Sequence, residues 1–403
     1  MVKTFSYAQF VSKRKFENFL ISPLILAGRL ISFLRPLEAT YDIFFLFPFY
    51  HTGGAEKFNA AVANAVKGRR AIIFFTRKSS NTTFLKDFED SGHRLIDISK
   101  YTDNKWLYFL NIVYRGIITG YLNRQHTKTI VFNGQCNFAY KISPWVKKEI
   151  IQLEFIHTFC TLSYIRPPFL SYYHHTISSS QKTINDHITY YKKSKVPDIY
   201  DKRFLYILYG IQLPPFVNRT DSEAKTIKVL FVGRGTQEKR VHIVALMAKK
   251  ANEDRLPVQF EFMGDVKESI PDQLQAYCFF HGNKSDVSEI FSIYKQCHTL
   301  VITSIFEGFP FAVMEAMSQG LAILSTPVGD VPYHVKNDMN GYIIPELINE
   351  EIIVSEGVSF IRRLCNERKT LKNISKENQD YGYANFNITV FNKNYQKLLE
   401  SFL

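Results

Sequence analysis

Short apolar runs rich in β-branched and aromatic residues alternate with segments of helical spacing along most of the chain. In the first half these runs lie at residues 43–47, 71–76, 94–98, 129–133, 150–155 and 204–209. The rhythm restarts in the second half, with runs at residues 228–233, 258–264, 299–303 and 322–325. Strand-like runs that alternate with helical segments are typical of βαβ units around a parallel sheet. The pattern therefore predicts two doubly wound α/β domains.

A boundary between these domains is expected near residue 216. A chain of 403 residues exceeds what one hydrophobic core usually serves. Residues 212–222 contain two prolines and a polar run, which continue neither a strand nor a helix. We therefore predict an N-terminal domain over residues 1–216, a C-terminal domain over 217–386, and a final helix over 387–403 that packs back across the junction.

The first 40 residues are predicted to form an amphipathic segment. Its apolar run at residues 21–28 ends at Arg29, short of the roughly 20 residues that a membrane-spanning helix needs. No small-residue cleavage site precedes Arg29 and Arg35, which argues against a signal peptide. We expect an amphipathic helix over residues 16–37 and no spanning helix; such a helix serves equally to cover the core of its own domain or to contact a membrane.

Charge is distributed unevenly between the two halves. The chain carries 50 basic and 37 acidic residues; residues 1–216 hold 29 of the basic and 14 of the acidic ones. The first half thus carries a net charge of +15 and the rest of the chain −2, which indicates a polyanion or an anionic membrane surface near the first half. A nucleic-acid-binding protein is one alternative, but the basic residues are scattered and no zinc-finger, KH or RNP-type motif occurs.

The cysteines indicate a cellular compartment. There are five of them, an odd number, and none forms a C-x-x-C pair. We expect a reducing, cytoplasmic setting, with peripheral contact to the inner face of the cell membrane.

One candidate binding segment covers residues 304–317, where a strand leads through a loop into a helix. Free backbone N–H groups and the positive end of a helix dipole favour an anion such as phosphate at that position. Glu307 lies in the loop and Glu315 in the helix, so both carboxylates are expected at the C-terminal edge of the sheet, where doubly wound folds bind ligands. The alternative is an ordinary helix start with two solvated glutamates.

A second candidate segment follows the first strand of the same half. Arg234 and Lys239 flank a strand-to-helix loop and are suited to a diphosphate, the guanidinium by paired hydrogen bonds and the ammonium as a point charge. A solvated basic turn is the alternative. The run from Gly233 matches a dinucleotide fingerprint only partly, because Glu238 replaces its third glycine.

The order of these motifs resembles that of retaining glycosyltransferases of family 4, which have the GT-B fold of two Rossmann-like domains facing a central cleft. The resemblance runs from residue 227 to 345 and rests on Gly-Arg…Glu-Lys at 233–239, Phe-Met-Gly at 262–264, Phe-His-Gly at 280–282, and two glutamates eight residues apart at 307 and 315. It continues with Ser-Thr-Pro-Val-Gly at 325–329 and Asn-Gly-Tyr at 340–342. Where relatives often carry Gly-Gly-x-x-Glu, this chain has Gly329-Asp330-Val-Pro-Tyr, so the usual role of that glutamate is in doubt.

The resemblance implies a role for each of these residues. Arg234 and Lys239, on the loop from Gly233, would neutralise the leaving diphosphate, and Glu315 would hold the ribose hydroxyls. Glu307 would face the sugar at its anomeric carbon. The backbone of the loop would meet phosphate or sugar at Gly308, Phe309, Pro310 and Phe311.

The first half matches the same family more sparsely. Gly53 and Gly54 follow the first strand, where glycine lets the backbone approach a donor phosphate or sugar; a plain tight turn before a helix is the alternative. His157 also follows a strand, and similar enzymes place a histidine there beside the reacting sugar. A histidine satisfied within the core is the other interpretation.

These expectations together define a reaction. The resemblance implies transfer of a sugar, with retention, from a UDP- or GDP-linked donor to a hydroxyl of a glycan or lipid-linked acceptor. Charge develops on the departing diphosphate, so fixed cations and N–H donors should dominate catalysis. No D-x-D pair or metal-ligand spacing occurs, and we expect no metal and no cofactor. Phosphorolysis or epimerisation on the same scaffold is the alternative.

Overall fold

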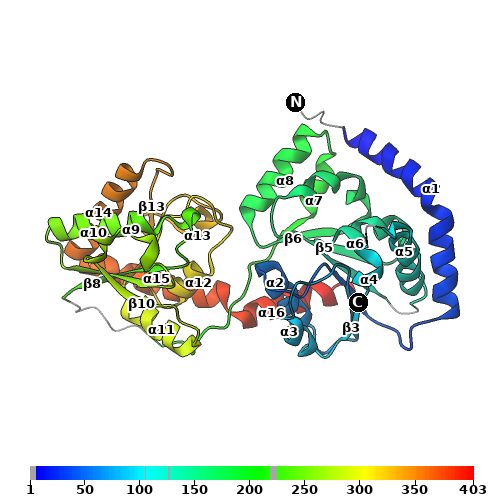
Figure 1. Ribbon diagram of the computed structural model, residues 1–403, viewed down its shortest axis with the longest axis horizontal. Helices are drawn as coiled ribbons and strands as arrows, with labels where there is room; N and C mark the ends of the chain where they lie inside the picture. Colours follow the sequence, from blue (N-terminus) through cyan, green and yellow to red (C-terminus); the bar gives the residue numbers. More distant parts are fainter. Residues whose placement is uncertain (1–5, 105, 126–127, 218–224) are drawn as a thin grey trace. The chain divides into compact units, whose positions relative to one another are not determined.

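The computed structural model describes residues 6–104, 106–125, 128–217 and 225–403 (Figure 1). Its chain divides into two units, one formed by residues 1–209 with 391–403 and the other by residues 210–390. The first division thus lies at 209/210, where the sequence predicted 216/217, and the second at 390/391 in place of 386/387. The last part of the proline-containing segment, residues 218–222, lies outside the described residues.

The first domain is built on a seven-stranded parallel sheet. Its strands lie in the order β3-β2-β1-β4-β5-β6-β7, so the chain order reverses between β1 and β4. Every residue of β1, β2 and β4 is buried, as expected for strands covered on both faces. The strands are β1 (Ile43–Phe47), β2 (Ala71–Phe75), β3 (Arg94–Asp97), β4 (Ile130–Gly134), β5 (Ile151–Phe155), β6 (His175–Ser178) and β7 (Phe204–Tyr206).

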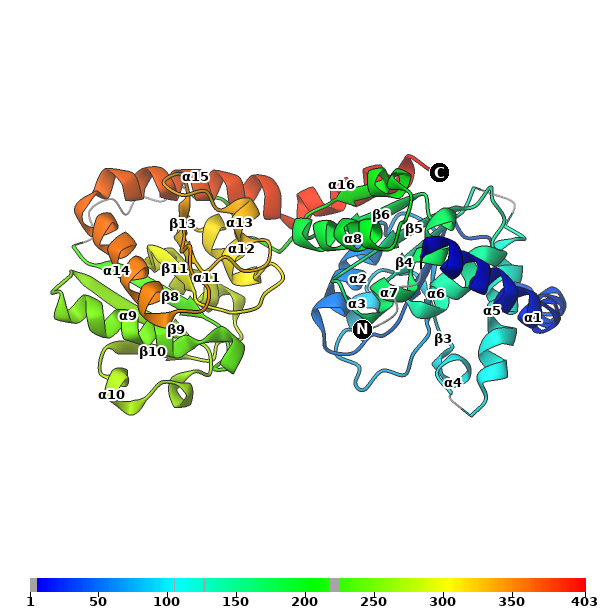
Figure 2. The same ribbon diagram turned by 90° about the horizontal axis from the view of Figure 1, so that it is seen from above.

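Helices cover both faces of this sheet (Figures 1 and 2). They are α1 (Tyr7–Leu34), α2 (Gly54–Ala65), α3 (Leu85–Glu89), α4 (Ser99–Thr102), α5 (Tyr108–Leu122), α6 (Asn137–Ile142), α7 (Thr161–Ile165) and α8 (Gln181–Lys193). The C-terminal helix α16 (Ile388–Glu400) also packs here: Phe391 and Tyr395 contact the ring of Phe58, and Gln396 donates to the carbonyl of Ala65 at 2.8 Å.

Helix α1 is longer than the sequence predicted and begins at Tyr7. It packs along α5 through glycines, because a Cβ on Gly28 would lie 2.0 Å from the carbonyl oxygen of Val113 and one on Gly116 would lie 2.2 Å from that of Ile25. The Nη2 of Arg29 donates to the carbonyl of Trp145 at 2.8 Å. The charge that was expected to end the apolar run is therefore directed at the domain, while the helix exposes apolar side chains such as Phe19 and Leu34 together with the charged Lys13.

By length and composition alone, α1 is also able to cross a membrane. In its most apolar window of 18 residues, 17% is buried inside the protein and the rest is not. The sequence prediction of no spanning segment missed this, since it counted Arg29 as a break. Core helices and signal sequences near an N-terminus pass the same criterion.

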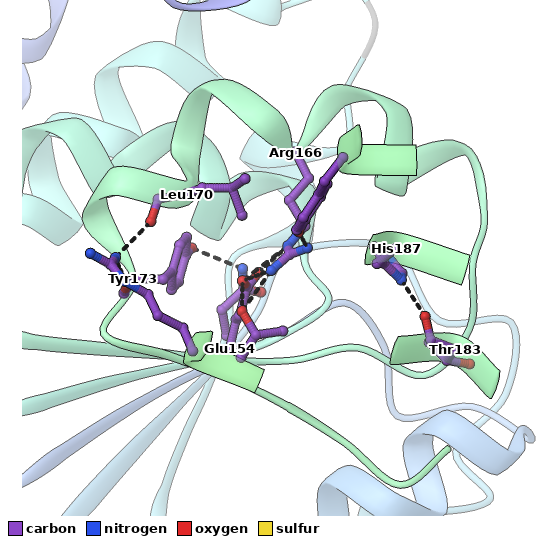
Figure 3. Close-up of polar contacts among 10 residues, drawn as sticks. Glu154, Arg166, Leu170, Tyr173, Thr183 and His187 are labelled. Carbon is purple, nitrogen blue, oxygen red and sulfur yellow. Dashed lines mark hydrogen bonds and ion pairs between the residues drawn. The ribbon is translucent and has the colours of Figure 1, made fainter. Parts of the chain in front are cut away.

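A buried polar cluster lies inside the first domain (Figure 3). Arg166 follows α7, and its Nε lies 2.9 Å from both carboxylate oxygens of Glu154 on β5. The hydroxyl of Thr176 on β6 joins them, 2.6 Å from Arg166 Nη2 and 2.6 Å from Glu154 Oε1. Arg166 and Glu154 are 1% and 0% exposed, so this ion pair fixes how α7 packs on the sheet without contact with water.

The second domain repeats the architecture on a six-stranded parallel sheet. The strand order β10-β9-β8-β11-β12-β13 reverses between β8 and β11. The strands are β8 (Ile227–Val232), β9 (Val258–Met263), β10 (Cys278–Gly282), β11 (Thr299–Ile302), β12 (Ala322–Ser325) and β13 (Gly341–Ile343).

Its helices flank the sheet, and α15 lies along α12 (Figure 2). They are α9 (Val241–Glu253), α10 (Asp272–Gln275), α11 (Val287–Gln296), α12 (Phe311–Ser318), α13 (Val331–His334), α14 (Glu350–Asn366) and α15 (Arg368–Phe386). The core between the sheet, α9 and α14 includes Phe231, Met247 and Phe262.

The predicted strands agree with the observed ones to within two residues, except that β7 ends at Tyr206 and not at residue 209. The sequence missed β6, β10 and β13, which are short or only partly buried. The prediction of two doubly wound α/β domains is confirmed.

Candidate active site

In the second domain, the loops after β8 and β9 pack closely at the carboxyl edge of the sheet. Gly264 has a φ of 126°, and a Cβ there would lie 1.9 Å from the carbonyl oxygen of Gly233. The N–H of Gly235 donates to the carbonyl of Asp265 at 3.0 Å. Glycine is thus required for close approach, and the loop from Gly233 is held while the side chain of Arg234 stays exposed.

The loop after β11 joins this arrangement at the point where the strand order reverses. The N–H of Ile305 donates to the carbonyl of Glu238 at 2.9 Å, and the hydroxyl of Thr303 donates to that of Lys239 at 3.0 Å. Lys239 Nζ forms an ion pair with the carboxylate of Glu307, which also accepts from Ser304 Oγ at 2.7 Å. The structure therefore brings together Lys239 and Glu307, two residues that the sequence analysis assigned to one site.

Sequence reasoning missed a buried arginine beneath these loops. Arg240 caps the start of α9 in the left-handed region, at φ 47°, and is 7% exposed. Its guanidinium donates to the carbonyls of Thr303 at 2.7 Å and Leu347 at 2.8 Å. Arg240 thus fixes the loop of Glu307 relative to that of Lys239. In the sequence, the only indication of this role was that Arg240 directly follows the charged residues Glu238 and Lys239.

The segment from Gly308 to Phe311 leads into α12, as predicted. Its path is fixed by the loop after β12: the N–H of Asp330 donates to the carbonyl of Gly308 at 2.8 Å. Gly329, at φ 53°, allows this contact, because a Cβ there would lie 1.7 Å from the same oxygen. The ring of Phe309 stacks on His334 with centroids 4.3 Å apart, and Pro310 is the N-cap of α12.

Glu315 lies one turn into α12 and is half-buried. Its Oε2 accepts from the hydroxyl of Tyr294 on α11 at 2.8 Å. Burial raises the pKa of Tyr294 well above its ordinary value, so this hydroxyl stays a donor. A carboxylate has about four lone-pair positions, so Glu315 keeps the capacity to accept further hydroxyls. Nothing in the sequence singled out Tyr294.

In the first domain, Gly53 and Gly54 lie between β1 and α2. Gly53 is extended, and a Cβ there would lie 2.1 Å from the carboxylate of Glu56. Glu56 is 5% exposed and lies 3.9 Å from Nε2 of His51. Gly54 is exposed with open space around its Cα. The loop thus presents bare backbone at the carboxyl end of β1, and the buried Glu56 beneath it was not assigned from sequence.

His157 lies two residues past β5, at the same edge of the first sheet. Its backbone N–H donates to Oε1 of Gln135 at 2.8 Å, and its ring packs 4.6 Å from that of Phe155. Burial lowers the pKa of His157 to about 3, so the imidazole is neutral at physiological pH. Its Nε2 has no hydrogen-bond partner among the residues that the structure describes.

The predicted site residues fall into two groups, one in each domain. Gly53, Gly54 and His157 belong to the first domain, and the other group, from residue 233 to 315, belongs to the second. Within the described ranges, no cluster of three or more His, Cys, Asp or Glu side chains is placed to hold a metal ion.

A family model matches part of the chain. Residues 216–380 match the family described as "Glycosyl transferases group 1". In sequence, the chain is 22% identical over 206 residues to a putative colanic acid biosynthesis glycosyltransferase of Escherichia coli, WcaL, covering 48% of this chain and 50% of that protein. It is 26% identical over 122 residues to an uncharacterized glycosyltransferase of Methanocaldococcus jannaschii, covering 28% of this chain and 30% of that one. The matches thus span half or less of these relatives.

Solved structures match over most of the chain. HepE of Anabaena in complex with UDP is 15% identical, with a TM-score of 0.66 over 89% of this chain and 100% of that one. The lipopolysaccharide outer core galactosyltransferase WaaB is 17% identical, with a TM-score of 0.66 over 90% and 99%. At this level of identity such matches show the fold. The chain therefore has the GT-B fold of these glycosyltransferases, and its residues 216–380 are similar to the group 1 glycosyl transferases.

Proposed function

We propose that the protein is a retaining glycosyltransferase that moves a hexosyl group from a UDP- or GDP-linked sugar to a hydroxyl acceptor in surface polysaccharide or glycolipid biosynthesis. One observation carries the proposal: at the switch point of the second sheet, Lys239 and Glu307 are paired beside the exposed Arg234 and the first turn of α12. Ligands of doubly wound folds bind at such a point. The group 1 match covers all of these residues.

The proposed chemistry needs positive charge at one place. The bond from the anomeric carbon to the β-phosphate oxygen breaks, and a bond to the acceptor oxygen forms on the same face of the sugar. The acceptor proton passes to the departing diphosphate. Arg234, Lys239 and the positive end of the α12 dipole are suited to stabilise the negative charge that develops. Because these groups supply positive charge themselves, we propose that transfer proceeds without a metal.

Glu307 and His157 have different proposed roles. Glu307 pairs with Lys239, so it positions that ammonium and faces the anomeric carbon. His157 is neutral, because burial lowers its pKa to about 3, and its Nε2 lacks a partner in the described part of the chain. We propose that it exchanges a hydrogen bond with the sugar and carries no charge during the reaction.

The relatives support the choice of substrate class. HepE has been solved with UDP and with UDP-glucose, which supports a UDP-linked donor. WcaL is named for colanic acid biosynthesis and WaaB for the lipopolysaccharide outer core, which supports a polysaccharide or glycolipid acceptor.

The test is a screen of UDP- and GDP-sugars against the purified chain. The correct donor raises the melting temperature, since ligand at 100 times its Kd stabilises by about 2.7 kcal/mol. Product NMR then reads the anomeric configuration, which we expect to be retained, and EDTA should leave the rate unchanged. An inverted product, or loss of activity that Mg²⁺ or Mn²⁺ restores, contradicts the corresponding part of the proposal. A sugar phosphate or an epimerised sugar nucleotide as product identifies the alternative reactions.

We also propose that the first domain docks on the anionic inner surface of the cell membrane through α1. The helix exposes large apolar side chains along its length: Phe16, Phe19, Leu20, Leu24, Leu26, Leu30, Ile31, Phe33 and Leu34. Many large apolar side chains exposed on one helix mark a membrane or protein interface. The net charge of the first half supports a lipid surface, because each Lys or Arg near an anionic membrane contributes about 1 kcal/mol.

Vesicle co-sedimentation tests the docking. Binding should rise with anionic lipid, fall with salt, and weaken in the variants Phe19→Ser and Phe33→Ser, whose side chains are 76% and 66% exposed. Ile348→Ser, at a 65% exposed apolar residue of the second domain, is the matched control and should bind like the parent. Equal binding to neutral and anionic vesicles would contradict the role of charge.

A further inference from the structure

The first domain contains a cavity of about 520 Å³ that the donor chemistry does not use. It lies at the carboxyl edge of the sheet, lined by the loops after β1, β2, β4 and β5 together with the start of α5. The strand order reverses between β1 and β4, so this is the switch point of the first sheet. Position and volume are both those of a small-molecule site.

Positive charge outweighs negative charge in the lining. Arg77 and Lys141 line the cavity with one carboxylate, that of Asp103. Asp103 Oδ1 lies 3.5 Å from Nε of Arg77, and its Oδ2 accepts from the backbone N–H of Lys78 at 3.2 Å. Asp103 is thus already engaged. The side chain of Arg77 is 56% exposed, which leaves its other N–H groups accessible to a ligand.

A second wall of the cavity is also cationic. The hydroxyl of Tyr108 accepts from Lys141 Nζ at 3.2 Å and from Nη2 of the buried Arg115 at 2.9 Å. Burial acts to raise the pKa of Tyr108, but the charges of Arg115 and Lys141 outweigh it and lower that pKa below its ordinary value. These two cations therefore stabilise negative charge on an oxygen atom at this wall, which favours an anionic ligand.

Aromatic and amide side chains complete a surface suited to a sugar. The ring of Phe49 stacks on that of His51 with centroids 4.3 Å apart and lies 4.8 Å from the guanidinium carbon of Arg77, so Tyr108 is the ring that the cavity offers to a sugar. Flat rings pack against the apolar face of a pyranose while neighbouring amides meet its hydroxyls. Asn137 lines the cavity, and its Oδ1 is buried without a partner in the described ranges. Rotation of this amide about χ2, which is a soft torsion, offers that oxygen to a hydroxyl.

Gln135 connects this cavity to His157. It lines the cavity, and its side chain holds the loop after β5, accepting from the N–H of His157 at 2.8 Å and donating to the carbonyl of Thr158 at 3.1 Å. Gln135 has a φ of 58°, an uncommon conformation for a residue other than glycine. Such strain is found where function fixes a residue. One end of the cavity thus adjoins the loop proposed to contact the reacting sugar.

From this arrangement we infer that the cavity is the acceptor site and that its acceptor is an anionic saccharide, bearing a phosphate or a carboxylate that pairs with Arg77 and Lys141. The inference rests on the proposed glycosyltransferase function and names the chemical class of its acceptor. The sugar ring packs on Tyr108, and its hydroxyls meet Gln135 and Asn137.

The test is calorimetric titration of the full chain with three probes: glucose 1-phosphate, methyl glucuronoside and methyl glucoside. Saturating UDP is present so that the phosphate probe does not report on the donor site. We expect at least one anionic probe to bind about tenfold more tightly than the neutral one, as a charge-assisted hydrogen bond implies. Tighter binding of glucose 1-phosphate identifies a phosphate as the charged group of the acceptor, and tighter binding of methyl glucuronoside identifies a carboxylate.

Three variants locate the binding. Arg77→Gln and Lys141→Met should each weaken the anionic probe about tenfold while leaving the neutral probe unchanged. Lys78→Gln is the matched control, an exposed cation next to Arg77 that does not line the cavity, and should bind like the parent. Melting temperatures of all variants should equal that of the parent, since neither cation is buried.

The outcomes separate this inference from the proposed function. Titration of the parent with UDP and with GDP tests the donor site alone, and binding of neither nucleotide contradicts the proposed function whatever the anionic probes do. If either nucleotide binds but no anionic probe does, or if all three probes bind equally, the inference is overturned. It is also overturned if tight binding of the anionic probe survives both Arg77→Gln and Lys141→Met.

Discussion

Lys239 and Glu307 form an ion pair between the loops that follow β8 and β11, two strands that are neighbours where the order of the second sheet reverses. Their side chains are 22% and 12% exposed, so the pair is partly shielded from water yet open to a ligand. Each charge holds the other in place. The donor is expected to meet a cation whose position is already fixed, which is the arrangement that electrostatic catalysis requires.

Substitutions of this pair should separate charge from position. Lys239→Met removes the cation and should abolish most transfer, with a loss of about tenfold or more in affinity for UDP. Glu307→Gln keeps that affinity within a few-fold but slows turnover, because Lys239 loses its partner. A double-mutant cycle should give a coupling of about 0.5–3 kcal/mol. Lys249→Met, an exposed lysine on α9, is the control. Parental turnover in Lys239→Met would remove the diphosphate assignment.

Arg234 and Arg240 should respond in opposite ways to substitution. Arg234 is exposed, so Arg234→Ala is expected to weaken UDP binding with an unchanged melting temperature. Arg240 is 7% exposed and donates to backbone carbonyls, so Arg240→Met leaves these unsatisfied and should cost about 1–3 kcal/mol of stability. Thermal unfolding and calorimetric titration of both variants check this. If Arg234→Ala lowered the melting temperature and left UDP binding unchanged, Arg234 would have a structural role and not a role in donor binding.

The sequence was sufficient to predict the two α/β domains, because the apolar runs that mark strands are local features of the sequence. Runs such as 43–47 and 322–325 became strands with the predicted bounds, since a fully buried parallel strand is apolar throughout. The strand at Cys278–Gly282 was missed because its residues are only partly buried or exposed, so its pattern resembles a loop. The apolar run within α1 was placed too short because Arg29 reads as a break, although its side chain reaches the carbonyl of Trp145.

The site was predictable only in part, because partners distant in sequence cannot be read from spacing. Glu307 and Lys239 were each named, but their pairing depends on strand order, which the sequence does not show. Arg240 and Tyr294 support the site from beneath and carry no motif of their own. The cavity beside Gln135 is assembled from four loops, so no single stretch of sequence indicated it.

The buried pair of Glu154 and Arg166 should be sensitive to loss of one partner. Glu154→Gln leaves the guanidinium of Arg166 without its counter-charge and should cost about 3–5 kcal/mol of unfolding free energy. The double variant Glu154→Leu with Arg166→Met should recover most of that loss, because no charge then remains buried. Asp186→Asn breaks an exposed pair with Lys182 in the same domain and should change stability by less than about 1 kcal/mol. Urea unfolding measures all three, and a double variant as unstable as the single one would show that the pair contributes more than charge compensation.

His187 should make the stability of the first domain dependent on pH. Its ring is fully buried, with Nδ1 lying 2.8 Å from the carbonyl oxygen of Thr183 (Figure 3). Burial, aided by the charge of Arg166, lowers the pKa of His187 to about 3. The unfolded chain binds a proton to this histidine below its ordinary pKa of about 6.5, whereas the folded chain does so only near pH 3. The stabilising contribution is therefore complete above pH 6.5 and is lost as the pH falls from there toward 3.

The variant His187→Phe isolates this contribution. A phenyl ring suits the site, since the imidazole already packs 4.9 Å from the ring of Phe159. Between pH 7 and pH 5 the parent should lose about 2 kcal/mol more unfolding free energy than the variant, from 1.4 kcal/mol for each pH unit below 6.5. His157 and His334, whose pKa values burial lowers to about 3 and about 4, remain in both proteins and cancel in the comparison. Urea unfolding at the two pH values measures the difference, and parallel losses in parent and variant would mean that His187 takes up a proton in the folded domain.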